Sequence, residues 1–386
     1  MTRAYLDHAS SSPLRPVAYE AMLPWLAGPA AAGDPSRVHA EGHAARVALE
    51  TARQQVAALF GARPREVVFS SGGTEAINAA VFGAAARATA ATPGAGGNPH
   101  FVVTAVEHSA VLEAVRRAGR VTVVGTDGYG RVDPAAVLAA IEPDTALVCV
   151  QLGNHEVGTL QPAAEVMAAC RERGVLGHVD ACAAAGHVPV DFAVLGADLA
   201  SVTAHKLGGP RGVGALLVRR GLRLPPLLLG GAQERGRRAG AENVAAAAGF
   251  GAAAAELAGA GRLEAEAAAA RLRTDRLLSE APVLLPGVSV FGDPIDRLPH
   301  LVCLGIDGVE AEPVLIGLDR RGVAVHSGSS CSSETFEPSP VLRAMGVDAD
   351  HSLRVSVGWS STDADVDIFL KTLPEVVSRL RLLQPS

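Results

Sequence analysis

Short apolar runs rich in β-branched residues alternate with alanine-rich stretches along most of the chain. Most of these runs are separated by about one helix length, which is the pattern of βαβ units. We therefore expect an α/β fold with a mostly parallel sheet, and strands over residues 66–70, 101–105, 121–125, 146–151, 176–179, 199–203 and 214–218. Helices are expected most clearly where Ala, Leu, Glu and Arg dominate, at residues 40–60 and 263–278.

The order of the expected elements changes after about residue 260. A long helix is followed by strands at residues 288–291, 301–304, 323–326 and 353–357, and then by a helix near residues 363–383. Elements that no longer alternate are typical of an α+β unit. We therefore expect two domains: a large α/β domain over residues 16–260, and a smaller α+β domain formed by residues 1–15 and 261–386.

The composition indicates a globular protein with no marked electrostatic preference. Of the 386 residues, 48% are hydrophobic and 19% are charged, and the formal net charge is −6. This charge does not favour nucleic acid or a membrane surface, and no apolar stretch is long enough to span a bilayer. The start of the chain does not resemble a signal peptide, and the five cysteines form no Cys-x-x-Cys pair. We expect a cytoplasmic protein with free thiols that binds no nucleic acid, membrane or metal.

Lysine is scarce in this arginine-rich chain, and Lys206 has unusual surroundings. It follows a histidine and precedes a Gly-Gly-Pro turn, between apolar runs at residues 192–202 and 212–218. A desolvated lysine loses part of its preference for the charged form and can then form a Schiff base. Surface lysines are far commoner, so this segment alone is only a weak indication of chemistry.

Two further segments follow strands, where α/β proteins bind ligands. Residues 69–78 form a Gly-rich turn that starts a helix, and backbone amides in such a turn can bind phosphate with help from the Thr74 hydroxyl. Asp180 ends another apolar strand, where its carboxylate could hold the protonated pyridine nitrogen of pyridoxal phosphate. For residues 69–78 alone, a plain cap on a buried helix is favoured over phosphate binding, whereas Asp180 is equally suited to be a helix cap.

Three more segments carry reactive or polar side chains. His108 follows a strand and could stack on a planar cofactor, although such a histidine is more often a loop or capping residue. Residues 233–243 form a cationic loop that could serve anions or simply be solvated. Cys331 lies in a run of small polar residues, where a thiol is placed to react or is an incidental surface group.

Taken together and in this order, these segments resemble the cysteine desulfurases, which are pyridoxal phosphate enzymes of the class V aminotransferase group with fold type I architecture. The resemblance extends nearly from end to end, and the joint match is specific although no single motif is. It is carried by Tyr5-Leu-Asp-His-Ala, Gly33-Asp-Pro-Ser-Arg-Val-His39, Ser71-Gly-Gly-Thr-Glu75, Glu107-His108, Asn154-His-Glu-Val-Gly158, His178-Val-Asp180, His205-Lys206, Gly231-Ala-Gln-Glu234, Glu242-Asn243, Ser327-Gly-Ser-Ser-Cys331 and Arg354.

The resemblance implies that the large domain binds pyridoxal phosphate. Lys206 would form the Schiff base with the cofactor, Asp180 would pair with its pyridine nitrogen, and His108 would stack on its ring. Further residues that would contact the cofactor are Gly73, Thr74, Thr203 and His205 at its phosphate, and Asn154 and His155 beside its ring.

The resemblance also implies a homodimer that converts L-cysteine to L-alanine. Arg354 would clamp the substrate carboxylate, which its fork fits bidentately, and His155 would face the same group. Cys331 would take the sulfur as a persulfide on a mobile segment spanning residues 327–338. The sulfur would then pass to an acceptor protein, such as an iron–sulfur scaffold or a tRNA-thiolation enzyme.

The chain departs from the family pattern at three positions. Ala183 replaces a glutamine near the phenolic oxygen of the cofactor, His155 replaces an asparagine, and Ala241 replaces a threonine that reaches the cofactor phosphate of the other subunit. The vacated place near the phenolic oxygen could be filled by His155 or by water. Two other functions stay open: a carbon–sulfur or selenocysteine lyase of the same group, and a non-catalytic sulfur-transfer scaffold.

Overall fold

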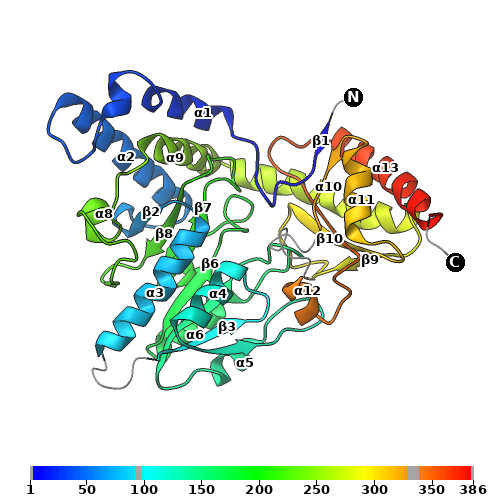
Figure 1. Ribbon diagram of the computed structural model, residues 1–386, viewed down its shortest axis with the longest axis horizontal. Coiled ribbons are helices and arrows are strands. Elements are labelled where there is room, and N and C mark those ends of the chain that lie inside the picture. The colour runs from blue at the N-terminus through cyan, green and yellow to red at the C-terminus, as the bar shows by residue number, and fades with distance from the viewer. Residues whose placement is uncertain (1–2, 92–97, 328–338, 384–386) are drawn as a thin grey trace.

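The computed structural model describes residues 3–91, 98–327 and 339–383, and its largest element is a seven-stranded sheet (Figure 1). The strand order is β2-β8-β7-β6-β5-β3-β4, with bounds β2 Val67–Ser70, β3 His100–Thr104, β4 Arg120–Val124, β5 Thr145–Gln151, β6 Leu176–Asp180, β7 Leu199–Thr203 and β8 Gly214–Val218. Strands β3 to β7 pair in parallel, whereas β8 is antiparallel to both of its neighbours. The predicted α/β fold with a mostly parallel sheet is therefore confirmed.

The three helices whose bounds were predicted are all present, as α2, α10 and α13. The helix bounds are α1 Pro16–Met22, α2 Ala40–Leu59, α3 Gly73–Ala91, α4 Ser109–Ala118, α5 Pro134–Ala139, α6 Ala163–Glu172, α7 Phe192–Leu195, α8 Gln233–Gly236, α9 Val244–Ala258, α10 Arg262–Leu284, α11 Ala311–Asp319, α12 Pro340–Ala344 and α13 Asp363–Arg381. Helix α10 extends six residues beyond its expected end, because Ala281 packs into an apolar core that the local pattern does not show.

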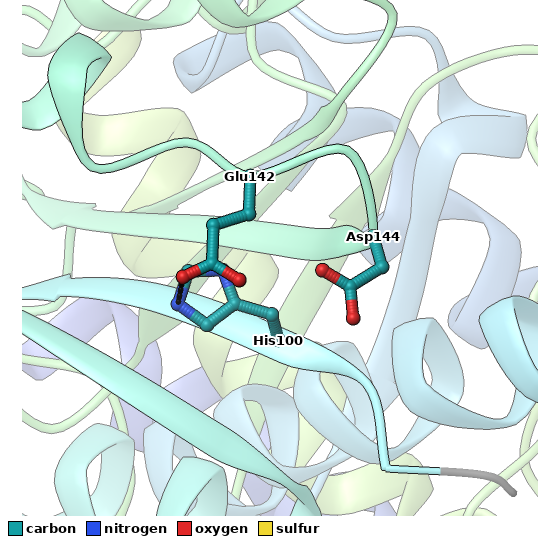
Figure 2. A group of neighbouring side chains, drawn as sticks. All are labelled: His100, Glu142 and Asp144. Atoms are coloured by element: carbon teal, nitrogen blue, oxygen red, sulfur yellow. Dashed lines mark ion pairs between the residues drawn. The ribbon is translucent and has the colours of Figure 1, made fainter.

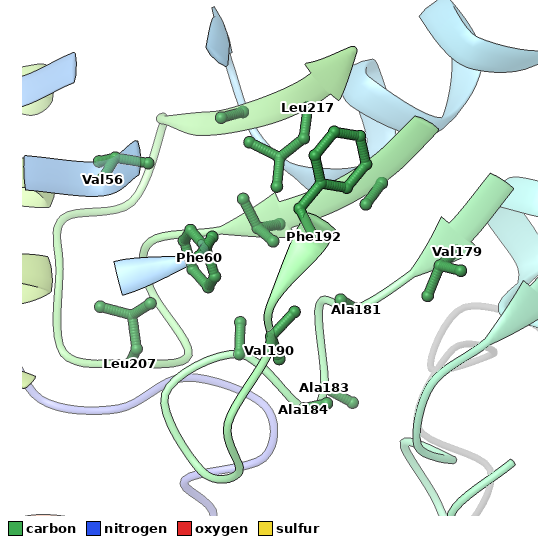
Figure 3. Packing of buried hydrophobic residues seen from close by; sticks show 14 of the residues in the cluster. Val56, Phe60, Val179, Ala181, Ala183, Ala184, Val190, Phe192, Leu207 and Leu217 are labelled. Atoms are coloured by element: carbon green, nitrogen blue, oxygen red, sulfur yellow. The ribbon is translucent and has the colours of Figure 1, made fainter. Parts of the chain in front are cut away.

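Helices cover both faces of the large sheet, which explains why its central strands are apolar at nearly every position. Val148 of β5 points into a core formed with helices α2, α6 and α9, whereas the preceding Leu147 points into a core formed with α3 and α4. Alternate residues of a strand point to opposite faces, so one strand serves both cores. Figure 3 shows part of the first core, where Phe60 and Phe192 pack among aliphatic side chains.

The C-terminal part has an antiparallel sheet of its own, with the order β12-β10-β9 and bounds β9 Val288–Phe291, β10 Leu301–Ile306 and β12 Ser352–Ser356. The N-terminal strand β1, Ala4–Tyr5, joins this part by pairing in parallel with β11, Val323–Ala324. Strand β11 is two residues shorter than expected, because β1 offers only two residues to pair with. A separate apolar core unites residues 4 and 6 with helices α10, α11 and α13. This core supports the two domains that we propose, one over residues 16–260 and one over residues 1–15 and 261–386.

Within the described ranges, no single helix is both long and apolar enough to cross a membrane. Helices α9 and α10 reach the length and apolar composition of a membrane span only when they are taken together, and they are bent by 81° relative to each other.

Candidate active site

The carboxyl ends of strands β5, β6 and β7 and the start of helix α3 meet at a cavity of about 270 Å³. This is the edge at which α/β sheets bind ligands, and the volume is close to the lower end of the ~300–1,000 Å³ typical of small-molecule pockets. Its walls include most of the predicted site residues, namely Gly73, Thr74, His108, His155, Asp180, Thr203, His205, Lys206 and Arg354.

Among the described residues, the predicted site residue Asn154 is not part of this wall. The Asn154 side chain is fully buried in its own loop, where its oxygen accepts from the amides of Glu156 and Val157 at 2.8 Å and its amide donates to Val106 O. Asn154 therefore shapes the loop that carries His155, and it does not line the cavity. Cys331 and the predicted mobile segment from residue 328 onward lie outside the described residues.

Asp180 is the last residue of β6 and brings a buried carboxylate into the cavity. Its Oδ1 accepts a hydrogen bond from the Cys182 amide at 2.9 Å. Burial acts to raise the pKa of Asp180, but nearby His108 and the Cys182 amide outweigh burial, and the pKa lies below its usual value. The cavity thus contains an ionised carboxylate that suits a cationic ring nitrogen.

His108 and His155 form one side of the cavity. His108 is the N-cap of α4, and its Nδ1 accepts from the Ala110 amide at 3.0 Å, which fixes the ring orientation. The His155 ring lies 5.0 Å from the His108 ring, tilted by 60°. His155 also places its Nε2 3.5 Å from Glu156 Oε1. Two neighbouring imidazole rings therefore line the cavity and could contact a planar ligand bound there.

The start of helix α3 and the end of β7 form a second, donor-rich part of the wall. Gly73 begins α3, and a Cβ atom there would lie 2.6 Å from the Cys182 sulfur, so only glycine allows this close approach. Thr203 Oγ1 lies 2.9 Å from His205 Nδ1. Burial, together with the charges of Lys206 and Arg211, lowers the pKa of His205 to about 4, so its ring is neutral near pH 7. Backbone amides and neutral donors of this kind suit a phosphate group.

Arg354 reaches the cavity from the smaller sheet. It lies on β12 and is 2% exposed. Its guanidinium donates to the His155 carbonyl at 2.9 Å, to Ser10 Oγ at 2.6 Å and to Asp7 Oδ1 at 3.1 Å. These bonds orient the guanidinium and leave the cavity open. A planar carboxylate needs a guanidinium oriented in this way in order to bind bidentately.

Residues 4–369 match the family described as Aminotransferase class-V, which is nearly the whole chain. The chain belongs to the class-V aminotransferase family. A cysteine desulfurase of Cereibacter sphaeroides is 41% identical over 394 residues, covering 100% of this chain and 98% of that protein. Cysteine desulfurase IscS of Dictyoglomus turgidum is 39% identical, covering 99% and 96%. The predicted family is confirmed, and this family implies pyridoxal phosphate as the cofactor.

Two solved structures are similar to this chain over nearly its whole length. A NifS-like protein superposes with a TM-score of 0.89 at 29% identity, covering 98% of this chain and all of that chain. A structure of SspA in complex with cysteine superposes with a TM-score of 0.79 at 27% identity, covering 94% and 100%. The predicted fold class is therefore supported by both sequence and shape.

The residues in the cavity fit pyridoxal phosphate on chemical grounds. The buried, ionised Asp180 matches the protonated ring nitrogen, and the amides at the start of α3 match the phosphate. Lys206, the only lysine in the wall, lies in the turn after β7, and a lysine amine is the group that forms a Schiff base with an aldehyde.

Sequence reasoning missed other residues of the wall, among them Gln151, Cys182 and Ser10. Gln151 is the last residue of β5, so a polar residue at a strand end was a usable signal. Ser10 gave no such signal, because it reaches the cavity only through the tertiary contact with Arg354.

A second group of chemically capable side chains lies at the other edge of the sheet. Figure 2 shows His100, Glu142 and Asp144 close together near the start of β3, with ligand-type atoms within 4.8 Å of one another. Arg120 already binds both carboxylates, at 2.9 and 2.8 Å. The two imidazole nitrogens of His100 each face a threonine hydroxyl at 2.8 Å. This group is therefore an ion-pair cluster and supports no metal assignment.

Proposed function

We propose that the protein is a cysteine desulfurase that depends on pyridoxal phosphate and converts L-cysteine to L-alanine, leaving a persulfide on Cys331. The observation that carries the proposal is the meeting of Lys206, Asp180 and Arg354 in one cavity. These are the three groups required to hold the cofactor covalently, to tune its ring and to bind an amino-acid carboxylate. The full-length similarity to cysteine desulfurases at about 40% identity supports the same activity.

In this proposal the residues of the cavity wall would hold the cofactor. Lys206 holds it covalently, Asp180 pairs with the ring nitrogen, and His108 borders the ring face. The phosphate and ring edges are served by Gly73, Thr74, Thr203, His205 and His155, with Asn154 shaping the loop that carries His155. When bound, pyridoxal phosphate supplies the electron sink that weakens bonds at the substrate Cα.

The protein groups then have separate tasks. Arg354 binds the substrate carboxylate and orients the Cα–H bond, and Lys206 Nζ takes the proton from Cα and can return it. The Cys331 thiolate forms a bond to the substrate sulfur while the carbon–sulfur bond of the substrate breaks. The electron pair stays with carbon, which takes up a proton, so the products are alanine and a persulfide.

The wider setting is also part of this proposal. We place the protein in the cytoplasm as a homodimer that passes sulfur to an acceptor protein, either an iron–sulfur scaffold or a tRNA-thiolation enzyme. Large apolar side chains, which dimers often bury, are exposed at Leu26, Val38 and Leu229. Light scattering tests this proposal, since a homodimer should give twice the chain mass of 39.3 kDa.

One assay tests the activity. Purified protein loaded with pyridoxal phosphate is incubated with L-cysteine, and alanine, sulfide and protein-bound persulfide are measured. Equal amounts of alanine and persulfide in the first turnover support the desulfurase. Free sulfide without persulfide would identify a lyase, and no alanine at all would leave a sulfur-transfer scaffold.

A further inference from the structure

The backbone carbonyl of Lys206 accepts hydrogen bonds from two side chains outside the cavity wall. Ser12 Oγ donates to it at 3.0 Å, and His187 Nε2 donates at 3.2 Å. A carbonyl oxygen can only accept, so the direction of both bonds is fixed. Both donors are buried. The Lys206 peptide is therefore anchored by groups that take no part in the proposed chemistry.

The Ser12 hydroxyl belongs to a longer chain of hydrogen bonds with a single consistent direction. The Gly358 amide donates to Ser361 Oγ at 3.0 Å, and Ser361 Oγ lies 3.2 Å from His8 Nε2. His8 Nδ1 lies 3.0 Å from Ser12 Oγ. Because Ser12 gives its proton to Lys206, it must accept from His8 Nδ1–H, and Ser361 must then donate to His8 Nε2.

The surroundings of His8 suit this arrangement. The side chain is fully buried, and a Cβ atom at Gly358 would lie 2.0 Å from its Nδ1, so only glycine fits against the ring. Burial lowers the pKa of His8 to about 4. The ring is therefore neutral at ordinary pH, with one nitrogen that donates and one that accepts.

The second donor is also held rigidly. The His187 ring stacks on the His300 ring with centroids 3.5 Å apart and planes 11° from parallel. His300 is 1% exposed and sits just before β10. Stacking fixes the plane of His187 and therefore the direction in which its Nε2–H points.

We propose that His8, Ser12 and His187 are positioning residues for the amine of Lys206. The chain from Gly358 to Ser12 connects the segment that follows β12, the strand of Arg354, to the peptide of Lys206. It thereby keeps the carboxylate-binding arginine and the nucleophilic lysine in register across the two proposed domains. This inference rests on the proposed function, in which Lys206 holds the cofactor.

The physical consequence concerns the reach of the lysine. A lysine side chain has a flexible four-carbon stem, so the position of Nζ depends on how well its peptide is fixed. Removing one of these donors leaves the Lys206 carbonyl with one hydrogen bond in place of two. The loss of one buried hydrogen bond corresponds to about a tenfold change in rate. A misplaced nucleophile reacts more slowly even when its ligand still binds.

Two variants of the full chain test the proposal, Ser12→Ala and His8→Phe. Pyridoxal phosphate is added to cofactor-free protein, and borohydride then fixes the bound cofactor at timed intervals. Peptide mapping gives the rate of cofactor capture at Lys206, and the exposed Lys371 serves as the internal reference. We expect both variants to slow capture at Lys206 about tenfold, without changing Lys371. Ser12→Thr keeps the hydroxyl and His8→Asn keeps a donor near the Nδ1 position, so both should recover most of the rate. If His8→Phe does not fold, the serine pair decides.

A matched control separates positioning from loss of stability. His100→Phe also removes a buried histidine that is bonded to two hydroxyls, but it lies at the far edge of the sheet. Unchanged capture in Ser12→Ala, or equal slowing in His100→Phe, overturns the proposal.

Backbone amide exchange over residues 205–209 distinguishes failure of this inference from failure of the proposed function. If wild-type protein fixes no pyridoxal phosphate at Lys206, the proposed function fails. Faster exchange in Ser12→Ala than in His100→Phe would then still support the anchor, and unchanged exchange would overturn it.

Discussion

Asp180 and His205 face the same cavity, but their surroundings lead to different charge states. Asp180 stays ionised because His108 and the Cys182 amide outweigh the effect of burial. His205 stays neutral because burial and the neighbouring cations lower its pKa to about 4. An anion bound near His205 must therefore be held by hydrogen bonds and helix amides and gains nothing from the charge of His205.

The first prediction concerns Lys206 itself. Purified protein should be yellow, and Lys206→Ala should lose the absorbance band, the borohydride-reducible link and turnover, because only this lysine lines the cavity. The chain offers a matched control, since Lys371 on the exposed side of α13 is its only other lysine. Lys371→Ala should keep all three properties. A reducible link that persists in Lys206→Ala as purified, without added pyridoxal phosphate, would show that the assignment is wrong.

A second prediction concerns His155, whose ring lines the cavity beside His108. If His155 donates to the phenolic oxygen of the cofactor, it favours the form in which that oxygen is most negative. His155→Ala should then raise the pH at which the bound cofactor changes colour by about one unit, equivalent to ~1.4 kcal/mol. Ala183→Gln in the same background should partly restore it. Identical spectral titrations of wild type and His155→Ala would indicate water in this place.

At the scale of elements, the segment that includes α8 is held by a buried ion pair. Glu234 and Arg235 adopt positive φ values of 48° and 60°, which non-glycine residues rarely do. Glu234 binds Arg53 of α2 through two bonds of 2.6 and 2.7 Å and also accepts from the Phe69 amide of β2. These contacts compensate for the backbone strain and hold the cationic loop beside the start of α3.

This pair gives a third prediction. Glu234→Gln should lower the free energy of unfolding by about 3 kcal/mol, because it removes the buried carboxylate partner of Arg53 and leaves only the partly exposed Glu50. The exposed pair between Glu113 and Arg116 has a similar length of 2.7 Å, and Glu113→Gln should cost about 1 kcal/mol or less. Denaturant unfolding of the cofactor-free variants compares the two. Equal losses would mean that burial is not what makes the first pair important.

A fourth prediction belongs to the segment between β11 and α12, which carries Cys331. Cys331→Ala should bind the cofactor and respond to L-cysteine with a colour change, yet form no persulfide and very little alanine. Mass spectrometry of the protein and amino-acid analysis measure the two products. Full alanine production by Cys331→Ala would mean that sulfur leaves without this thiol, as in a lyase.

At the scale of the whole molecule, several buried histidines link stability to pH. Burial is the main cause that lowers the pKa of His8, His178 and His205 to about 4 and that of His187 to about 3. In the unfolded chain these groups titrate near 6.5, so below that pH the unfolded state binds more protons. The neutral histidines therefore make their full contribution to the free energy of unfolding above pH 6.5, and this contribution is lost as the pH falls toward 4.

The fifth prediction follows from this linkage. The free energy of unfolding of the cofactor-free protein should fall by roughly 5 kcal/mol between pH 7 and pH 5. Burial raises the pKa of Glu107 to about 7, which opposes the loss of stability at low pH, and the expected change in the free energy of unfolding already includes this effect. Denaturant titrations at several pH values measure the change. A flat profile over this range would show that the histidines are hydrated in the folded protein.

The sequence alone determined the alternation of elements, the family and most of the cavity wall. These features are local: apolar periodicity defines strands such as β5, and a residue at a strand end, such as Asp180, points to the ligand-binding edge. The position of Lys206 between two apolar runs belongs to the same class of signal. Reading such signals requires no knowledge of which distant segments meet.

Only the tertiary structure decided which distant residues form hydrogen bonds with one another. Arg354 meets Ser10, and Lys206 meets Ser12 and His187, although each pair is separated in sequence. Local pattern does not encode these contacts, because the direction of a hydrogen bond and the space beside Gly358 depend on the packing of both cores at once. The lysine is therefore recognised from its neighbours in sequence, but its precise placement is set by residues some twenty to two hundred positions away, since a folded chain brings its N-terminal segment across the junction of two cores.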